Sequence, residues 1–98
     1  MGKRDRLPRE EYDLLVQEVF KRDRHRCQVC RLRAMLTAHH VIFRSQGGKD
    51  ELNNLLVLCE DCHMQGVHKS KIHIHFDNET NKFIIEISAG WKPKHTVR

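Results

Sequence analysis

The chain has 98 residues, 39% of them hydrophobic, and its 18 lysine and arginine residues against 13 aspartate and glutamate residues give a formal net charge of +5. A chain of this length predicts one domain, residues 1–98, with a modest core of the kind that a bound metal ion often stabilises. The positive net charge favours a polyanionic partner. Because no apolar run is long enough to span a bilayer and no signal-peptide core follows the N-terminus, we expect a cytoplasmic protein.

The N-terminal half predicts a helix, a cysteine turn, a strand and a loop. Residues 1–7 are expected to form a flexible basic tail. Pro8 suits a first helical turn, and an apolar stripe at helical spacing predicts an amphipathic helix over about 9–24. A Cys-x-x-Cys turn over 27–30 leads to a short strand over 38–43. Residues 46–50 form a loop in which the glycines permit positive φ.

The C-terminal half predicts a second strand, a short helix and a hairpin. Residues 55–58 are expected to be a buried strand, followed by a cysteine turn over 59–62 and a helix over about 61–68, which Gly66 weakens. Apolar residues alternate with polar ones over 72–76 and 83–87, and turn-forming residues at 77–81 separate them. This pattern predicts a hairpin with one buried face. Residues 91–98 are expected to be a second flexible basic tail.

Two cysteine pairs predict a structural zinc site. In a reducing compartment, short-spaced cysteines are typically metal ligands, and two residues between cysteines let both sulfurs reach one tetrahedral ion. Four thiolates leave no open position for a substrate, so the zinc would be structural. Free buried thiols or a redox pair are the alternatives. The predicted ligands are Cys27, Cys30, Cys59 and Cys62.

Eight histidines are a large excess for this length, but they are not equivalent. His39 and His40 are neighbours in a predicted strand, so their side chains leave on opposite faces and share a site only at a strand end or twist. His63 follows the last cysteine, where a zinc-fixed turn would hold it against the strand. Neutral imidazole can act as a general base or bind a metal ion. A surface role is the simpler interpretation of the histidines at positions 25, 73, 75 and 95.

The order of these residues resembles the HNH endonucleases, and most closely the small zinc-containing members of bacteria and phages. The resemblance covers roughly residues 25–69 and rests on several elements in order rather than on a lone His-Asn-His pattern. These elements are Cys27-x-x-Cys30, His39-His40-Val41-Ile42, Gly47-Gly48, Asn53-Asn54-Leu55 and Leu58-Cys59-x-x-Cys62-His63.

The resemblance implies an α+β fold with a ββα-metal (His-Me finger) core, flanked by the N-terminal helix and the C-terminal hairpin. It implies that His40 is the general base and that His39 and His63 bind a catalytic divalent ion. Asn54 would tie the loop that carries the base to the second strand. The activity implied is hydrolysis of DNA phosphodiesters, by nicking or double-strand cleavage, leaving 5′-phosphate and 3′-hydroxyl ends.

His68 is a candidate third ligand. Some related enzymes supply a histidine near this position, often four residues after the second ligand. On an α-helix the five-residue gap from His63 rotates the two side chains apart, unless Gly66 distorts the helix. Contact with a phosphate is the competing role. Because His39 stands where many relatives carry Asp, nitrogen ligands favour Mn²⁺, Ni²⁺ or Co²⁺ over Mg²⁺, which is not excluded.

Basic residues around the first cysteine pair and after the second predict contacts with the phosphates of double-stranded DNA. No base-reading element is evident, so we expect low sequence specificity. The protein would be a monomer or weak homodimer, and a phage or restriction system could supply a partner. The alternatives are a zinc-knuckle module that binds nucleic acid without cutting it, or an accessory subunit of a phage packaging or restriction system. The predicted DNA-binding residues are Arg24, Arg26, Arg31, Arg33, Arg44, Lys69 and Lys71.

Overall fold

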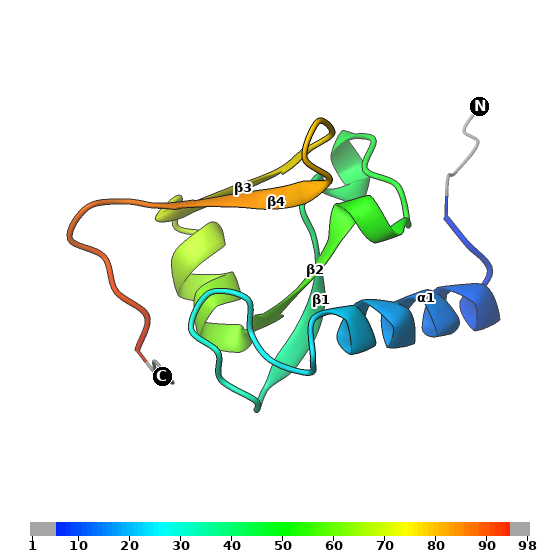
Figure 1. Cartoon of the computed structure of the whole chain (residues 1–98), viewed down its shortest axis with the longest axis horizontal. Helices are drawn as coiled ribbons and strands as arrows, with labels where there is room; N and C mark the ends of the chain where they lie inside the picture. The colour runs from blue at the N-terminus through cyan, green and yellow to red at the C-terminus, as the bar shows by residue number, and fades with distance from the viewer. Residues whose placement is uncertain (1–5, 95–98) are drawn as a thin grey trace.

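The structure, a computed structural model, describes residues 6–94 and begins with helix α1, Arg9–Arg22 (Figure 1). The helix ends two residues before the predicted end. Arg24 and His25 adopt left-handed φ values of 59° and 54°, which no α-helix can continue through. The apolar stripe of α1 buries Val19 against Leu55 and Val57.

Strands β1, Leu36–His40, and β2, Leu55–Cys59, form an antiparallel pair in which His40 lies opposite Leu55. The first strand was predicted over 38–43, but it begins earlier and stops at His40. Beyond His40, the Val41 amide donates to the carbonyl of Asn54 and the chain turns away into the loop. Two short 3₁₀ turns, Arg44–Gln46 (η1) and Leu52–Asn54 (η2), complete this loop.

The two adjacent glycines of the loop serve different purposes. Gly47 has φ +88° and ends η1 in the left-handed region, which suits a residue without a Cβ. Gly48 is needed for space, because a Cβ there would overlap the backbone carbonyl of Ile42. The loop therefore packs its own backbone more tightly than any other residue at position 48 allows.

The helix after the second cysteine pair is a π-helix, η3, Cys62–Val67, and not the predicted α-helix over 61–68. The amide of His68 donates to the carbonyl of His63 at 3.1 Å, five residues back. Gly66 is buried where the helix meets Ile72. The carbonyl of Gly66 accepts a hydrogen bond from the Lys71 amide, also five residues away. A helix wound in this way has a wider turn than an α-helix.

The predicted hairpin is confirmed as strands β3, Ile72–Asp77, and β4, Lys82–Ile87. It covers a core cluster that contains Leu56, Leu58 and the four cysteines, and Phe83, Ile85 and Trp91 pack against that cluster. Figure 1 shows the hairpin on the side of β2 away from α1. The fold is the predicted α+β arrangement.

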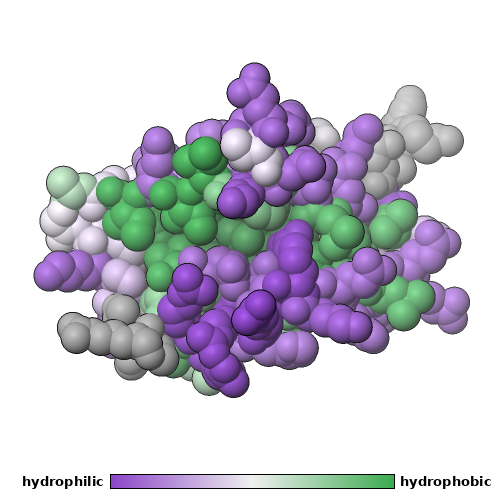
Figure 2. All heavy atoms as spheres, in the orientation of Figure 1, coloured by the Kyte–Doolittle hydropathy of each residue, from purple (hydrophilic) through white to green (hydrophobic). Residues whose placement is uncertain are grey.

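The two predicted tails lie mostly outside the described residues, which leave out 1–5 and 95–98. Leu7 donates its amide to Asp50, and Trp91 packs on the core. Between residues 6 and 94, no helix is both long and apolar enough to cross a membrane. On the face in Figure 2, apolar residues form a band across the middle, and strongly hydrophilic residues gather below it, over the segment after α1.

Candidate active site and metal centre

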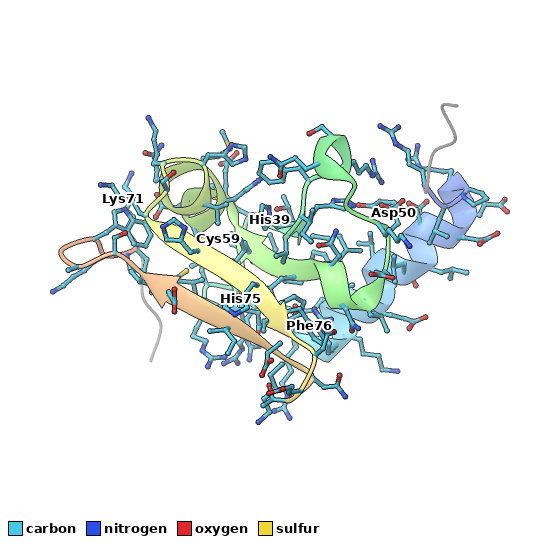
Figure 3. All side chains as sticks on the ribbon, turned by 90° about the horizontal axis from the view of Figure 1, so that it is seen from above. His39, Asp50, Cys59, Lys71, His75 and Phe76 are labelled. Atoms are coloured by element: carbon cyan, nitrogen blue, oxygen red, sulfur yellow. The ribbon has the colours of Figure 1, made fainter. Side chains whose placement is uncertain are left out.

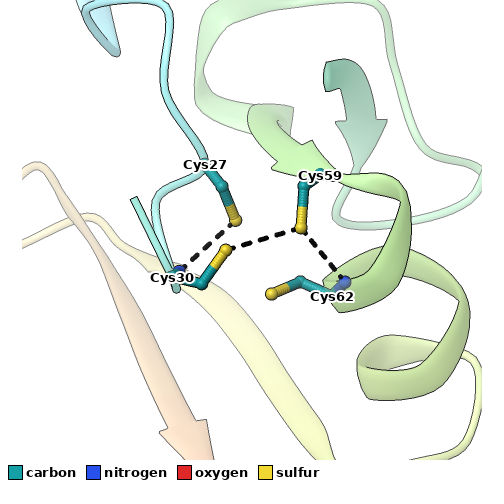
Figure 4. Close-up of side chains that lie close together, drawn as sticks. All are labelled: Cys27, Cys30, Cys59 and Cys62. Atoms are coloured by element: carbon teal, nitrogen blue, oxygen red, sulfur yellow. Dashed lines mark hydrogen bonds between the residues drawn. The ribbon is translucent and has the colours of Figure 1, made fainter. Parts of the chain in front are cut away.

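The four cysteines converge on one buried point (Figure 4). Their sulfurs all lie within 4.8 Å of one another, and Sγ of Cys30 is 3.5 Å from Sγ of Cys59. Two thiolates on one tetrahedral zinc ion, each about 2.3 Å from it, are about 3.8 Å apart. Backbone N–H groups, among them those of Cys30 and Cys62, point at the sulfurs of Cys27 and Cys59. The cluster could therefore hold a structural metal ion.

The electrostatics of the cluster favour a cation. A hydrogen bond from Cys62 lowers the pKa of Cys27 to about 4, against the opposing effect of burial. The same hydrogen bond, together with burial, raises the pKa of Cys62, and burial raises that of Cys30 to about 12. Without a metal, the buried sulfurs thus share protons and cannot all become thiolates. A bound divalent cation removes that conflict.

A second group of candidate ligands lies at the end of β1. His39, His40, His63 and His68 line one surface hollow of about 270 Å³, together with Ala38, Phe43 and Arg44. The ring centroids of His39 and His63 are 4.7 Å apart, and so are those of His63 and His68. Phe43 stacks on His68 and presents an edge to His39. The four histidines singled out from the sequence therefore meet in one place.

The π-helix brings His68 beside His63. Their Nε2 atoms are 3.1 Å apart, so one ring donates a hydrogen bond to the other. From the sequence, the five-residue gap predicts that the two rings lie apart, unless Gly66 distorts the helix. Five residues are one hydrogen-bonded step of a π-helix, so both rings leave the same face. Two nitrogens bound to one ion at about 2.0–2.1 Å are about 2.9–3.4 Å apart.

His39 is the buried member of the group, with 4% of its surface exposed. Burial, and then the nearby His63, His68 and His40, lower the pKa of His39 to about 4. Burial and His68 also lower the pKa of His63. These shifts favour the neutral form of both rings, which is the form that binds a metal ion. Among the His, Cys, Asp and Glu side chains of residues 6–94, only the four cysteines form a group of three or more that lies close enough together to hold a metal ion as it stands.

His40 occupies the opposite face of β1 and is held differently. Its Nε2 lies 2.8 Å from Oδ1 of Asp50, and its ring is parallel to that of Tyr12 at a centroid distance of 6.2 Å. The two histidines leave opposite faces, as neighbours on a strand must, and they share the hollow because β1 ends at His40. In Figure 3, His39 lies between η3 and the loop that carries Asp50.

Asn54 binds the loop that follows His40. Its side-chain oxygen accepts the Ile42 amide at 2.7 Å, and its Nδ2 donates to the carbonyls of Ile42 and Lys49, each at 2.9 Å. These are contacts of the kind that the resemblance implies for this position. Their importance for catalysis stays a prediction.

Asp50 was not among the residues predicted from the sequence, and its side chain is fully buried against His40 and Arg44. Burial tends to raise its pKa, but hydrogen bonds from Arg44 and His40 outweigh that effect and hold the pKa below its usual value. The acidic pair Asp50-Glu51, shortly after two glycines in a basic chain, was the available signal. Burial, which makes Asp50 unusual, is invisible in the sequence.

The predicted DNA-binding residues fall into separate places. Arg44 lines the histidine hollow, but its Nε and Nη2 donate to Asp50. Lys69 and Lys71 are exposed just beyond His68. The other four, predicted around the first cysteine pair, lie apart from the histidines. They line a different hollow of about 370 Å³, formed by Arg22, Asp23, Arg24, Arg26, Gln28, Arg31 and Arg33.

The fold is of the ββα-metal class. It has an antiparallel strand pair followed by a short helix, with imidazoles at the end of β1 and along η3. A family model described as HNH endonuclease matches residues 27–69. Anaredoxin of Nostoc sp. (strain PCC 7120 / SAG 25.82 / UTEX 2576) is 34% identical over 59 residues, 59% of this chain and 76% of that protein. The chain belongs to the HNH endonuclease family. No solved structure matches it significantly.

Membership of this family confirms the resemblance seen in the sequence. Its members are usually nucleases and generally bind DNA, which supports a nuclease-type function at that level.

Proposed function

We propose that this chain is a divalent-metal-dependent DNA endonuclease that hydrolyses phosphodiester bonds with low sequence specificity. The observation that carries the proposal is the histidine hollow, where His63 and His68 have Nε2 atoms 3.1 Å apart and His40 stands apart, held by Asp50. We also propose that residues 1–98 form one domain.

Three imidazoles, those of His39, His63 and His68, would hold the catalytic ion. The low pKa values of His39 and His63 keep their lone pairs available at neutral pH. A set of nitrogen ligands favours Mn²⁺, Ni²⁺ or Co²⁺, and Mg²⁺ remains a candidate. When bound, the ion would stabilise negative charge on the phosphate and on the departing 3′ oxygen. The cysteine cluster would hold a structural zinc ion, as a tetrahedral set of four sulfurs favours.

His40 would act as the general base. It takes a proton from a water molecule, and the electron pair of the broken O–H bond stays on the oxygen, which attacks phosphorus. The bond from phosphorus to the 3′ oxygen breaks, leaving a 5′-phosphate and, after protonation, a 3′-hydroxyl. One base and one ion cut one strand at each visit, so a monomer nicks DNA. A double-strand break needs a dimer or two events.

Double-stranded DNA would be held through its phosphates. Lys69 and Lys71 lie exposed beside the histidine hollow, and the arginine hollow after α1 offers further contacts. Phosphate contacts position a protein without reading bases, which accounts for the proposed low specificity. A phage or restriction system could supply a partner that directs the cut.

The function is tested by incubating supercoiled plasmid with the zinc-loaded protein and, in turn, Mn²⁺, Mg²⁺, Ni²⁺ or Co²⁺. We expect nicked plasmid from the wild type and a loss of about 10²–10⁴-fold in rate from His40→Ala. Truncation of His40 does not leave the Asp50 carboxylate unpaired, because Asp50 keeps its hydrogen bonds from Arg44 and from the Leu7 amide. His73→Ala is the matched control, since His73 is an exposed hairpin residue outside the hollow.

Zinc content and DNA affinity are measured for each variant. Cleavage by His40→Ala at the wild-type rate would remove the assignment of the base. If the wild type binds DNA but cuts none with any of the four ions, the chain is a binding module or accessory subunit.

A further inference from the structure

The carboxylate of Asp50 sits at the centre of a buried hydrogen-bond group. Its side chain is 0% exposed and accepts four hydrogen bonds. Oδ1 accepts from Nε2 of His40 at 2.8 Å and Nε of Arg44 at 3.0 Å. Oδ2 accepts from the Leu7 amide at 3.1 Å and Nη2 of Arg44 at 3.2 Å. The donors come from three separate segments of the chain.

These contacts determine where the proton of the His40 ring lies. A carboxylate paired with a guanidinium is ionised, and an ionised carboxylate can only accept hydrogen bonds. The nitrogen that faces it, Nε2, must therefore carry a hydrogen. A neutral imidazole carries one N–H, so Nδ1 is left with the lone pair.

The orientation of the ring is also fixed. Tyr12 lies parallel to it at an interplanar angle of 4°, and the guanidinium of Arg44 lies 5.0 Å above the ring of Tyr12. Arg44 thus contacts both the carboxylate and the aromatic ring that confine His40. The imidazole of His40, at the end of β1, is therefore confined by α1 on one side and by the loop after β1 on the other.

We propose that Asp50 is the positioning residue of the general base: it selects the Nε2–H tautomer of His40 and leaves Nδ1 as the atom that takes the proton from water. This inference rests on the proposed function for its chemical purpose. The proton moves from water to Nδ1, and the resulting imidazolium is stabilised by the carboxylate on its other side. Arg44 serves this arrangement by anchoring Asp50.

The tautomer can be measured without any cleavage. Zinc-loaded protein labelled with ¹⁵N at histidine, free of other divalent ions, gives two-bond ¹H–¹⁵N correlation spectra that distinguish the two neutral tautomers. We expect the His40 ring to be protonated at Nε2 in the wild type. In Asp50→Asn the amide can either accept or donate, so we expect a mixture of tautomers. Glu51→Gln, which removes an exposed neighbouring charge, should leave the spectrum of His40 unchanged.

A wild-type ring protonated at Nδ1 would overturn the proposal without any variant having to fold. Retention of the wild-type tautomer in folded Asp50→Asn, with zinc still bound, would also overturn it. Both results are independent of whether the protein cuts DNA.

Kinetics provide the second measurement. In the plasmid assay we expect Asp50→Asn to lower kcat by about 10–100-fold while KM is unchanged, as removal of a residue that orients a catalytic group does. Glu51→Gln should match the wild type. An equal kcat for Asp50→Asn and wild type would contradict a positioning role. If the wild type and both variants fail to cut DNA but the tautomers are as expected, the proposed nuclease function is refuted. The selection of the His40 tautomer by Asp50 then still stands.

Discussion

Asn54 and Asp50 are two buried polar residues that shape the same loop, and the sequence revealed only one of them. Asn54, 5% exposed, satisfies backbone groups of Ile42 and Lys49 that the loop would otherwise leave without partners. Its place between two histidine positions made it visible as part of a motif. Asp50 has no such spacing. Its partners His40, Arg44 and Leu7 are brought to it only by folding.

Arg26 carries an unusual polar group. Its Nε is buried without a hydrogen-bond partner among the described residues, in the arginine hollow. A buried donor without a partner costs about 1–3 kcal/mol. Arg24, Arg31 and Arg33 line the same hollow and form no ion pair with a described carboxylate. A phosphate group bound in the hollow would offset the local positive charge.

Replacement of Arg26 by Gln is therefore expected to weaken duplex DNA binding at all sequences alike. Each phosphate contact contributes about 0.9 to the slope of log affinity against log salt concentration, so the slope should fall in magnitude by about that amount. The slope is measured by fluorescence anisotropy of a labelled duplex over a series of salt concentrations. The control is Arg9→Gln, since Arg9 is exposed on α1 and paired with Asp13. An unchanged slope for Arg26→Gln would place the DNA elsewhere.

The π-helix η3 explains at the level of one element why His68 can join His63. An α-helical register would point residues five apart in different directions, whereas the observed register bonds His68 to His63 in both backbone and side chain. Gly66 lets the helix approach β3, because any Cβ there would meet the side chain of Ile72. Helix register and strand packing are thus linked.

Substitution of Gly66 by Ala tests this link. Overpacking a buried contact costs about 1–3 kcal/mol, and the better helix propensity of Ala returns only about 0.5–1 kcal/mol. We expect a net loss of about 1 kcal/mol, in a range of about 0–2.5 kcal/mol, in the free energy of unfolding, measured by urea denaturation of the zinc-loaded protein.

The second-site variant Ile72→Val removes Cδ1, the atom nearest to the new methyl group. By itself this change should cost about 0.5–1.5 kcal/mol. The double variant should lose less stability than the sum of the two single-variant losses, because removal of Cδ1 relieves the collision with the new methyl group. Strict additivity would show that Gly66 and Ile72 do not compete for the same space.

For the whole molecule, the cysteine cluster joins segments that secondary structure leaves far apart. Cys27 and Cys30 follow α1, whereas Cys59 and Cys62 link β2 to η3, and all four belong to the core cluster beneath the hairpin. The remaining core is small, with Val19, Leu55 and Val57 forming the other cluster. A metal ion held by the four cysteines would therefore supply cohesion that the apolar residues alone do not.

Removal of zinc is expected to unfold the protein. Structural zinc contributes about 10–16 kcal/mol in zinc-finger peptides, as much as the whole stability of an ordinary domain, about 5–15 kcal/mol. Far-ultraviolet circular dichroism during titration with a strong chelator should show loss of α1 and the strands, and added Zn²⁺ should restore them. Magnesium added instead should not. An unchanged thermal transition after verified metal loss would disprove a structural role for the ion.

The sequence by itself determined the order of the main elements, the four cysteines that cluster, and the identity of His39, His40, Asn54 and His63 as candidates, because these follow from local spacing and from a motif. The tertiary structure alone decided the end of β1, the π register that turns His68 toward His63, and the burial of Asp50 against His40 and Arg44. The physical reason is that strand ends, helix register and the partners of a buried charge depend on contacts between distant segments. No local pattern records those contacts.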